Sequence, residues 1–142
     1  MSDVAGCLAC DLVSGRRELP GGVVSATANR RVEHCVGPLG VGTLVVKPTR
    51  HVVHLADLEP AEAAELGPLL QRSADVYVCL WSHAGGVPVH IHFVVQPVSR
   101  AAIDERGFFG PVLQVAMFNA DVEPPRPEVE QFCERARAEL DR

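Results

Sequence analysis

One short segment, Val89–Val95, constrains the fold most, because its side chains alternate in character between Pro88 and Pro97. Successive side chains of a β-strand point to opposite faces, so the alternation predicts a strand. One of its faces carries His90 and His92, whose Cα atoms would lie roughly 7 Å apart. That spacing suits a metal ligand beside a catalytic group. It equally fits two surface histidines on a half-exposed strand.

The cysteines do not predict a disulfide framework, because there are five of them and the first six residues show no secretory leader. Cys7 and Cys10 form the one closely spaced pair, and three interpretations remain open for it. A thioredoxin-like redox pair would follow a strand, and only six residues precede Cys7. A zinc site would take two further ligands from elsewhere. Two ordinary thiols near a terminus are the third interpretation, and the same reading applies to Cys35, Cys79 and Cys133.

Composition excludes several classes of protein. The 142 residues are 47% hydrophobic and 22% charged, which indicates one globular domain. A net charge of −5 without a basic stripe argues against binding to a nucleic acid polymer. No apolar run approaches the roughly 18 to 20 residues of a membrane-spanning helix. We therefore expect a cytoplasmic protein with no membrane partner.

Periodicity and turn residues predict an α+β fold with a mostly antiparallel sheet. A short helix is expected over residues 8–14, and three strands are expected at Val23–Ala26, Arg31–Val36 and Thr43–Lys47. One long packing helix is expected to open at Asp57–Pro60, with Pro60 at its first position and a bend or restart at Gly67–Pro68. Apolar residues at spacings of three and four extend this helix through Tyr77 to Trp81. Residues after Arg100 look less regular, and Glu128–Leu140 is expected to form a C-terminal helix.

Several motifs together resemble the histidine triad (HIT) superfamily. His90-Ile91-His92-Phe93-Val94-Val95 is similar to the signature strand His-φ-His-φ-His-φ-φ, where φ is apolar. The segment Cys7–Gly15 is similar to the family's Cys-x-x-Cys opening and short helix. Gly42–His51 is similar to its third strand with the Pro-x-Arg-His turn, and Leu55–Leu58 also matches. The resemblance covers roughly residues 5–100 and implies a homodimer. We expect a HIT-like core over residues 1–100 and, outside the resemblance, a C-terminal extension over 101–142 packed on the same domain.

The resemblance also implies a structural zinc ion. In zinc-bearing relatives the ligands correspond to four residues of this chain: Cys7, Cys10, His51 and His90. Such a closed Cys2His2 set leaves no open coordination position for catalysis. Its expected role is to pin the N-terminus to the strand that carries the active site. His54 is the alternative to His51 as the third ligand.

Carried over from the family, His92 is the catalytic nucleophile. Its imidazole would attack the α-phosphorus of a nucleotide or nucleoside phosphate conjugate and pass the nucleotide to water or another acceptor. Glycine backbone at Gly85 and Gly86 is expected to approach the phosphate closely. The side chains of Ser82 and Arg100 are further substrate-binding candidates.

Departures from the family pattern leave two hypotheses. Val94 stands where the third histidine belongs, and Gly86 and Val87 replace the polar residues that usually contact phosphate. Cys35 lies at the position of the acidic residue that binds ribose, and Glu33 would serve only if the register slips. The chain is either a zinc-stabilised hydrolase or nucleotidyltransferase, or a catalytically impaired nucleotide-binding or scaffold protein that retains the zinc site.

Overall fold

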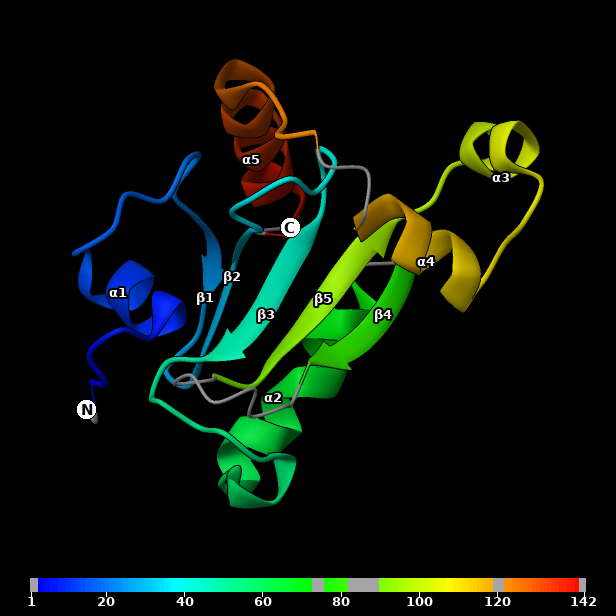
Figure 1. The fold of residues 1–142 in the computed structure, drawn as a ribbon. Coiled ribbons are helices and arrows are strands. Elements are labelled where there is room, and N and C mark those ends of the chain that lie inside the picture. The colour runs from blue at the N-terminus through cyan, green and yellow to red at the C-terminus, as the bar shows by residue number, and fades with distance from the viewer. Residues whose placement is uncertain (1–2, 73–75, 82–89, 119–121, 141–142) are drawn as a thin grey trace.

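A five-stranded antiparallel sheet forms the centre of the fold, with the strand order β1-β2-β3-β5-β4 (Figure 1). The computed structural model describes residues 3–72, 76–81, 90–118 and 122–140, and these strands lie within those ranges. Their bounds are Val23–Ala26 for β1, Arg30–His34 for β2, Leu44–Pro48 for β3, Val76–Trp81 for β4 and His92–Pro97 for β5. The predicted α+β class with an antiparallel sheet is confirmed.

The long helix is shorter than the sequence pattern predicts. Helix α2 (Pro60–Gln71) has Glu59 as its N-cap, Pro60 at its first position, and a capping box completed by Glu62. It continues through Pro68 and ends at Gln71.

The predicted continuation of this helix to Trp81 is wrong, because Val76–Trp81 forms β4 and pairs with β5 along its whole length. Tyr77 and Trp81 are therefore strand residues rather than members of a helix packing face. The segment is rich in β-branched and aromatic residues, which favour strands. Pairing with β5 satisfies the backbone hydrogen bonds of this segment. The spacing of its apolar residues does not reveal that pairing.

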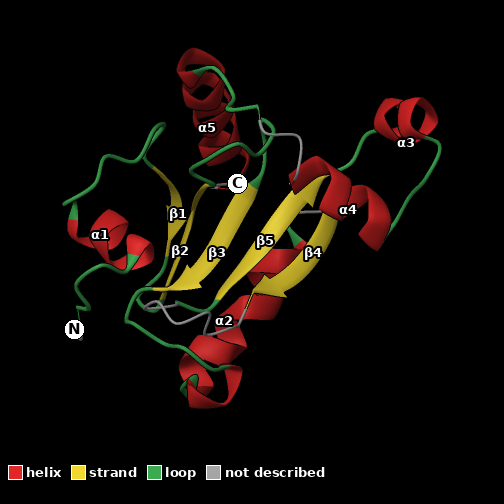
Figure 2. Ribbon diagram, viewed as in Figure 1, coloured by secondary structure: helices red, strands yellow, loops and turns green. Residues whose placement is uncertain are grey.

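The hydrophobic core lies on one face of the sheet, beneath α2 and the C-terminal helix α5 (Arg126–Leu140) (Figure 2). Side chains from four strands meet Leu69 of α2 and Val129 and Cys133 of α5 there. We call this the core face. Helix α1 (Leu8–Ser14) lies over the opposite face at β2 and β3, and we call that the cavity face.

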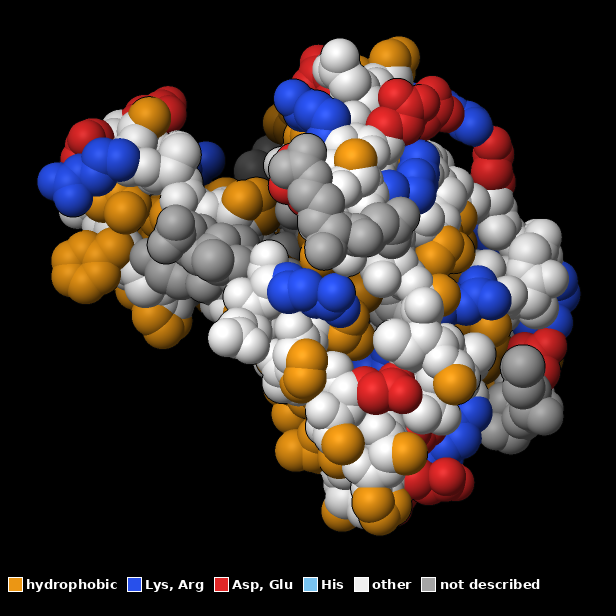
Figure 3. All heavy atoms as spheres, turned by 180° about the vertical axis from the view of Figure 1, so that it is seen from behind, with side chains coloured by type: hydrophobic (Ala, Val, Ile, Leu, Met, Phe, Trp, Pro, Cys, Tyr) orange, Lys and Arg blue, Asp and Glu red, His pale blue; other side chains and the backbone are white. Residues whose placement is uncertain are grey.

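Residues after Arg100 are more regular than expected, because they form α3 (Arg100–Arg106) and α4 (Pro111–Phe118). Ser99 caps α3 at its start by accepting a hydrogen bond from the Ala102 backbone N–H, and Gly107 in the left-handed region ends it. Helix α3 stands beyond the β4 side of the sheet, far from α1 (Figure 1). Viewed from behind, the part of the molecule that contains α3 carries hydrophobic side chains on its surface (Figure 3). Phe109, between α3 and α4, is 75% exposed.

No described helix is both long enough and apolar enough to cross a membrane.

Candidate functional site

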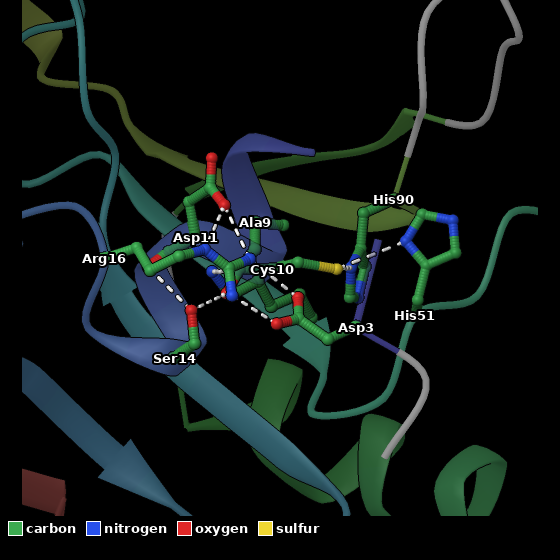
Figure 4. Close-up of polar contacts among 9 residues, drawn as sticks. Asp3, Ala9, Cys10, Asp11, Ser14, Arg16, His51 and His90 are labelled. Carbon is green, nitrogen blue, oxygen red and sulfur yellow. Dashed lines mark hydrogen bonds and ion pairs between the residues drawn. The ribbon is translucent and has the colours of Figure 1, made fainter. Parts of the chain in front are cut away.

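Two cysteines and two histidines from distant parts of the chain meet at the N-terminal end of α1. Their candidate ligand atoms all lie within 4.8 Å of one another, and they belong to Cys7, Cys10, His51 and His90. Cys7 caps α1 and Cys10 lies in its first turn, whereas His51 follows β3 and His90 precedes β5. The Cys10 Sγ lies 3.4 Å from Nδ1 of His51 and 3.9 Å from Nδ1 of His90 (Figure 4).

These separations fit a tetrahedral metal site. Bonds of about 2.3 Å to sulfur and 2.0 to 2.1 Å to nitrogen place sulfur and nitrogen ligands about 3.6 Å apart. The Nε2–H of His90 donates a hydrogen bond of 3.0 Å to the Pro48 carbonyl, so that its Nδ1 keeps the lone pair that faces the cluster. Burial lowers the pKa of His90 to about 4, which keeps the imidazole neutral as a ligand must be. Two thiols and two imidazoles form the donor set typical of a structural zinc.

The cluster joins the N-terminal segment to the rest of the sheet. Cys7, Cys10 and His90 are buried and His51 is half-buried. Burial raises the pKa of the Cys10 thiol, so its thiolate needs a nearby positive charge such as a metal ion supplies. Arg16 adds a second tie, because its guanidinium pairs with Asp3 and Asp11 on either side of the cysteines (Figure 4). His54, the alternative ligand, is exposed and is not a member of the cluster.

His92, the expected nucleophile, is the first residue of β5 and is half-buried. Its Nδ1–H donates a hydrogen bond of 2.8 Å to the His90 carbonyl, which fixes the tautomer with the lone pair on Nε2. This is the backbone support that the family resemblance implies for the attacking ring. The predicted strand begins later than expected, at His92 rather than Val89, so His90 lies just before it.

A cavity of about 210 Å³ opens beside His92. Helix α1 forms an apolar wall of three side chains, those of Leu8, Ala9 and Leu12. The sheet forms the floor through Glu33, Val45 and Lys47, with Cys35 and Val36 at one end and His90 and His92 also lining it. The cavity thus combines the His92 imidazole with an apolar compartment, and the Cys2His2 cluster lies at the N-terminal end of the helix that walls it.

A buried ion pair lies in the cavity floor, and sequence reasoning did not find it. The Lys47 ammonium pairs with Oε1 of Glu33, and the two residues are 1% and 2% exposed. Lys47 Nζ also donates to the Ala9 carbonyl of α1 at 3.4 Å. The available signal was Lys47 itself, a lone charge in the otherwise apolar stretch Leu44–Pro48. Cys35 lines the same cavity, and burial raises the pKa of its thiol to about 11.

The remaining predicted residues are not brought to the cavity by the described structure. Ser82, Gly85 and Gly86 lie outside the described residues. Arg100 begins α3, its side chain is 85% exposed, and it pairs with Asp104 at 3.3 Å. Val94, at the position of the third histidine, is buried at 3% exposure and offers no hydrogen bond.

Comparisons with known proteins identify the fold. No protein-family model matches the sequence, and no curated protein matches it. Among solved structures, a Zn-bound histidine triad family protein from Mycobacterium smegmatis matches with a TM-score of 0.67 and 23% identity, over 95% of each chain. A Hit-like protein involved in cell-cycle regulation from Bartonella henselae matches with a TM-score of 0.70 and 15% identity, over 99% of this chain and 100% of that one.

A diadenosine triphosphate hydrolase from Plasmodium falciparum also matches, with a TM-score of 0.56 and 15% identity, over 84% of this chain and 76% of that one. The likeness to these three structures covers 84% to 99% of this chain. The chain therefore has the fold of the histidine triad proteins, as its motifs led us to expect.

Proposed function

We propose that this chain is a nucleotide hydrolase or nucleotidyltransferase that acts on nucleoside phosphate conjugates through His92. The observation that carries the proposal is the tautomer of His92, whose Nδ1–H is held by the His90 carbonyl beside the cavity. A fixed neutral imidazole presents its Nε2 lone pair to an electrophile without the entropic cost of reorienting the ring. The solved structures of similar fold include a diadenosine triphosphate hydrolase, which supports a substrate of this class.

The proposed reaction has two displacement steps at one phosphorus. The Nε2 lone pair of His92 forms a bond to the phosphorus, and the bond from phosphorus to the leaving group breaks with its electron pair. A proton from solvent neutralises the departing group. Water or another nucleophile then attacks the same phosphorus, loses its proton, and displaces His92 with its lone pair restored. Phosphoryl chemistry of this kind depends on positioning and charge neutralisation.

We propose a structural role for zinc at the four-residue cluster. Cys7, Cys10, His51 and His90 would hold the ion and leave no coordination position for a substrate. When bound, zinc would supply the positive charge that stabilises two buried thiolates. This would hold α1 against the sheet and keep His90, whose carbonyl orients His92, in place.

A second candidate function rests on Val94. This buried residue replaces a histidine of the triad and provides no donor for a phosphate oxygen. Such a chain would bind nucleotides, or act as a scaffold, with little catalysis. Turnover decides between the two candidates.

We propose that the protein is a homodimer that pairs through β4. This strand has β5 on one side, and the described part of the chain places no strand on its other side. Val78 and Leu80 share one face of β4 and are 42% and 40% exposed. An edge strand with exposed apolar side chains is a template for pairing with a second copy. Light scattering should show a dimer, and Leu80→Lys should shift it to a monomer.

The test of the enzymatic proposal is turnover with an adenosine phosphoramidate, dinucleoside polyphosphates and adenylylsulfate. We expect hydrolysis of at least one, and mass spectrometry should detect a nucleotide linked to His92. His92→Asn should lower kcat by about three orders of magnitude or more. His54→Asn, at an exposed histidine outside the cluster, is the matched control and should leave turnover unchanged. Nucleotide binding without turnover would favour the scaffold function instead.

A further inference from the structure

The two carboxylate oxygens of Glu33 have different surroundings. Oε1 accepts a hydrogen bond from Lys47 Nζ, whereas Oε2 is buried and has no hydrogen-bond partner. An ionised carboxylate accepts several hydrogen bonds, and a buried oxygen that makes none is unusual in a folded protein. Among the described residues that line the cavity, Glu33 is the one with such an oxygen. Glu33 lines the cavity, so the cavity floor contains one buried acceptor that lacks a hydrogen-bond partner.

The strand register places this acceptor on the same face of the sheet as His92. Glu33 pairs with Val45, and Val45 pairs with Val94, so these three side chains form one row on the cavity face. The neighbouring row contains Lys47, and continuing the β3–β5 register by one residue brings His92 beside it. A ligand with its phosphorus at His92 would thus reach Glu33 by crossing Lys47 and the width of β3. Adjacent strands are about 4.8 Å apart, so β2 and β5 are separated by two spacings, or roughly 10 Å, which is about the length of a nucleoside.

The walls around Glu33 indicate what kind of group enters. Leu8, Leu12 and Val36 present carbon atoms to the cavity, which suits the flat faces of an unsaturated ring. A phosphate group fits this end poorly, because its oxygens and Oε2 of Glu33 are all hydrogen-bond acceptors and Lys47 already donates to Oε1. The group here should therefore be the nucleobase, and its edge should carry a hydrogen-bond donor.

We propose that Glu33 Oε2 reads the exocyclic amino group of the substrate's nucleobase, which makes Glu33 a specificity-determining residue. This inference rests on the proposed function and names the substrates that it favours: conjugates of nucleosides whose base carries an amino group. Carboxylates are established acceptors for base amino groups. Lys47 acts as a positioning residue, because its bonds to Glu33 and to the Ala9 carbonyl hold the carboxylate at the junction of β2, β3 and α1.

The experiment compares nucleotides that differ only in the amino group. Calorimetry on the intact protein would measure Kd for adenosine 5′-monophosphate against purine riboside 5′-monophosphate, and for cytidine 5′-monophosphate against its analogue without the 4-amino group. We expect the amino-bearing member of at least one pair to bind about 10- to 100-fold more tightly, as for a hydrogen bond to a charged group. Equal Kd values within both pairs would overturn the role of Glu33 and leave the proposed function standing. If no nucleotide binds, the proposed function and this inference both fail.

Two variants assign the preference to Glu33. In Glu33→Gln the amide oxygen faces Lys47 and the amide NH2 faces the ligand, so donor meets donor and the preference should disappear. In the double variant Glu33→Met/Lys47→Met both charges are removed together at similar volume, which buried ion pairs often tolerate. It should fold, shown by an unchanged circular dichroism spectrum, and discriminate less than twofold. Glu18→Gln, at an exposed pair with Arg126, is the matched control and should retain the preference. A preference that survives in both Glu33 variants would overturn the proposal.

Discussion

The two faces of the sheet are buried by different means. On the core face, α2 and α5 cover apolar side chains such as Val32, Val46 and Val95, and the contacts are hydrophobic. On the cavity face, the polar contacts of α1 are the thiol and imidazole cluster and the hydrogen bond from Lys47 Nζ to the Ala9 carbonyl. Hydrophobic contacts tolerate small shifts, whereas metal ligands and ion pairs fix atoms at defined distances. The core face is therefore closed by apolar packing, and the cavity face by polar contacts that hold atoms at defined positions.

The largest loss of stability is expected when the cavity face can no longer bind a metal ion while the core face is unchanged. Purified protein should contain about one zinc per chain, and Cys10→Ser should abolish zinc binding and lower the free energy of unfolding by about 3 kcal/mol or more. Elemental analysis and chemical denaturation measure the two quantities.

Cys79→Ser removes a thiol that is outside the cluster, so it should retain full zinc content. A metal-free protein with the stability of the original would contradict the structural role of the cluster.

The next effect tests the packing of the core face. Gly21 has a φ of +75°, and a Cβ added there would lie 2.9 Å from the Cβ of Cys133 on α5. Gly21→Ala should lower the free energy of unfolding by about 2 to 4 kcal/mol, because it combines backbone strain with overpacking. Urea denaturation measures the loss.

Gly15 is a matched control, with a φ of +76° and no atom within 4 Å of an added Cβ. Gly15→Ala should show only the backbone penalty of about 1 kcal/mol. Equal losses for the two variants would mean that α5 shifts to make room for the methyl group.

A smaller effect depends on pH and arises at His34, which is 2% exposed. Its Nδ1–H donates to the Cys35 carbonyl at 2.8 Å, and its Nε2 accepts from the Gly42 backbone N–H at 3.0 Å. Burial lowers the pKa of His34 below 6.5, so the unfolded chain binds this proton more readily than the folded one. The contribution of neutral His34 to the stability of the folded state is therefore complete above pH 6.5 and is lost as the pH falls below that value.

The expected slope is at most about 1.4 kcal/mol per pH unit. His34→Gln should reduce the pH dependence of unfolding between pH 7.5 and 5 relative to the original chain. Parallel curves for the two proteins would contradict this, because they would mean that His34 binds its proton equally well in the folded and unfolded states.

The smallest effect is expected at Arg100, which belongs to neither face. Its side chain is 85% exposed and pairs only with a similarly exposed Asp104 among the ion pairs found. Arg100→Ala should change the free energy of unfolding by less than about 0.5 kcal/mol and leave nucleotide affinity unchanged. A clear loss of affinity would instead show that α3 reaches a substrate, in this copy or in a second one.

Local patterns predicted the elements whose identity depends on nearby residues. The strand Val23–Ala26 and the helix Leu8–Ser14 have the predicted bounds, and Pro60 opens α2 as expected. The segment Val76–Trp81 was misassigned because its apolar residues fit a helical spacing as well as a strand, and only pairing with β5 decides between them. The meeting of the two cysteines and two histidines was expected only from the resemblance to a family, since Cys10 and His90 are 80 residues apart and no local pattern links them.

The Glu33–Lys47 pair shows why the rest of the site was not predictable. Each residue alone looks like an ordinary charge on a strand. Their contact depends on the β2–β3 register, in which Arg31 lies opposite Lys47 and Glu33 opposite Val45. A shift of one residue would send Glu33 to the other face of the sheet. Register is a property of the assembled sheet, so the residue sequence leaves this ion pair undetermined.

The four-residue cluster has a consequence for how the molecule opens. A bound ion would cross-link α1 to a residue 80 positions along the chain, while the core face would stay closed by its own hydrophobic contacts. Chelation would then release α1 as one cooperative unit, because a short helix has little stability of its own. Amide hydrogens of Leu8–Ser14 would exchange with solvent together, before those of β3 and β5. The wall of the cavity would thus respond to metal availability independently of the core.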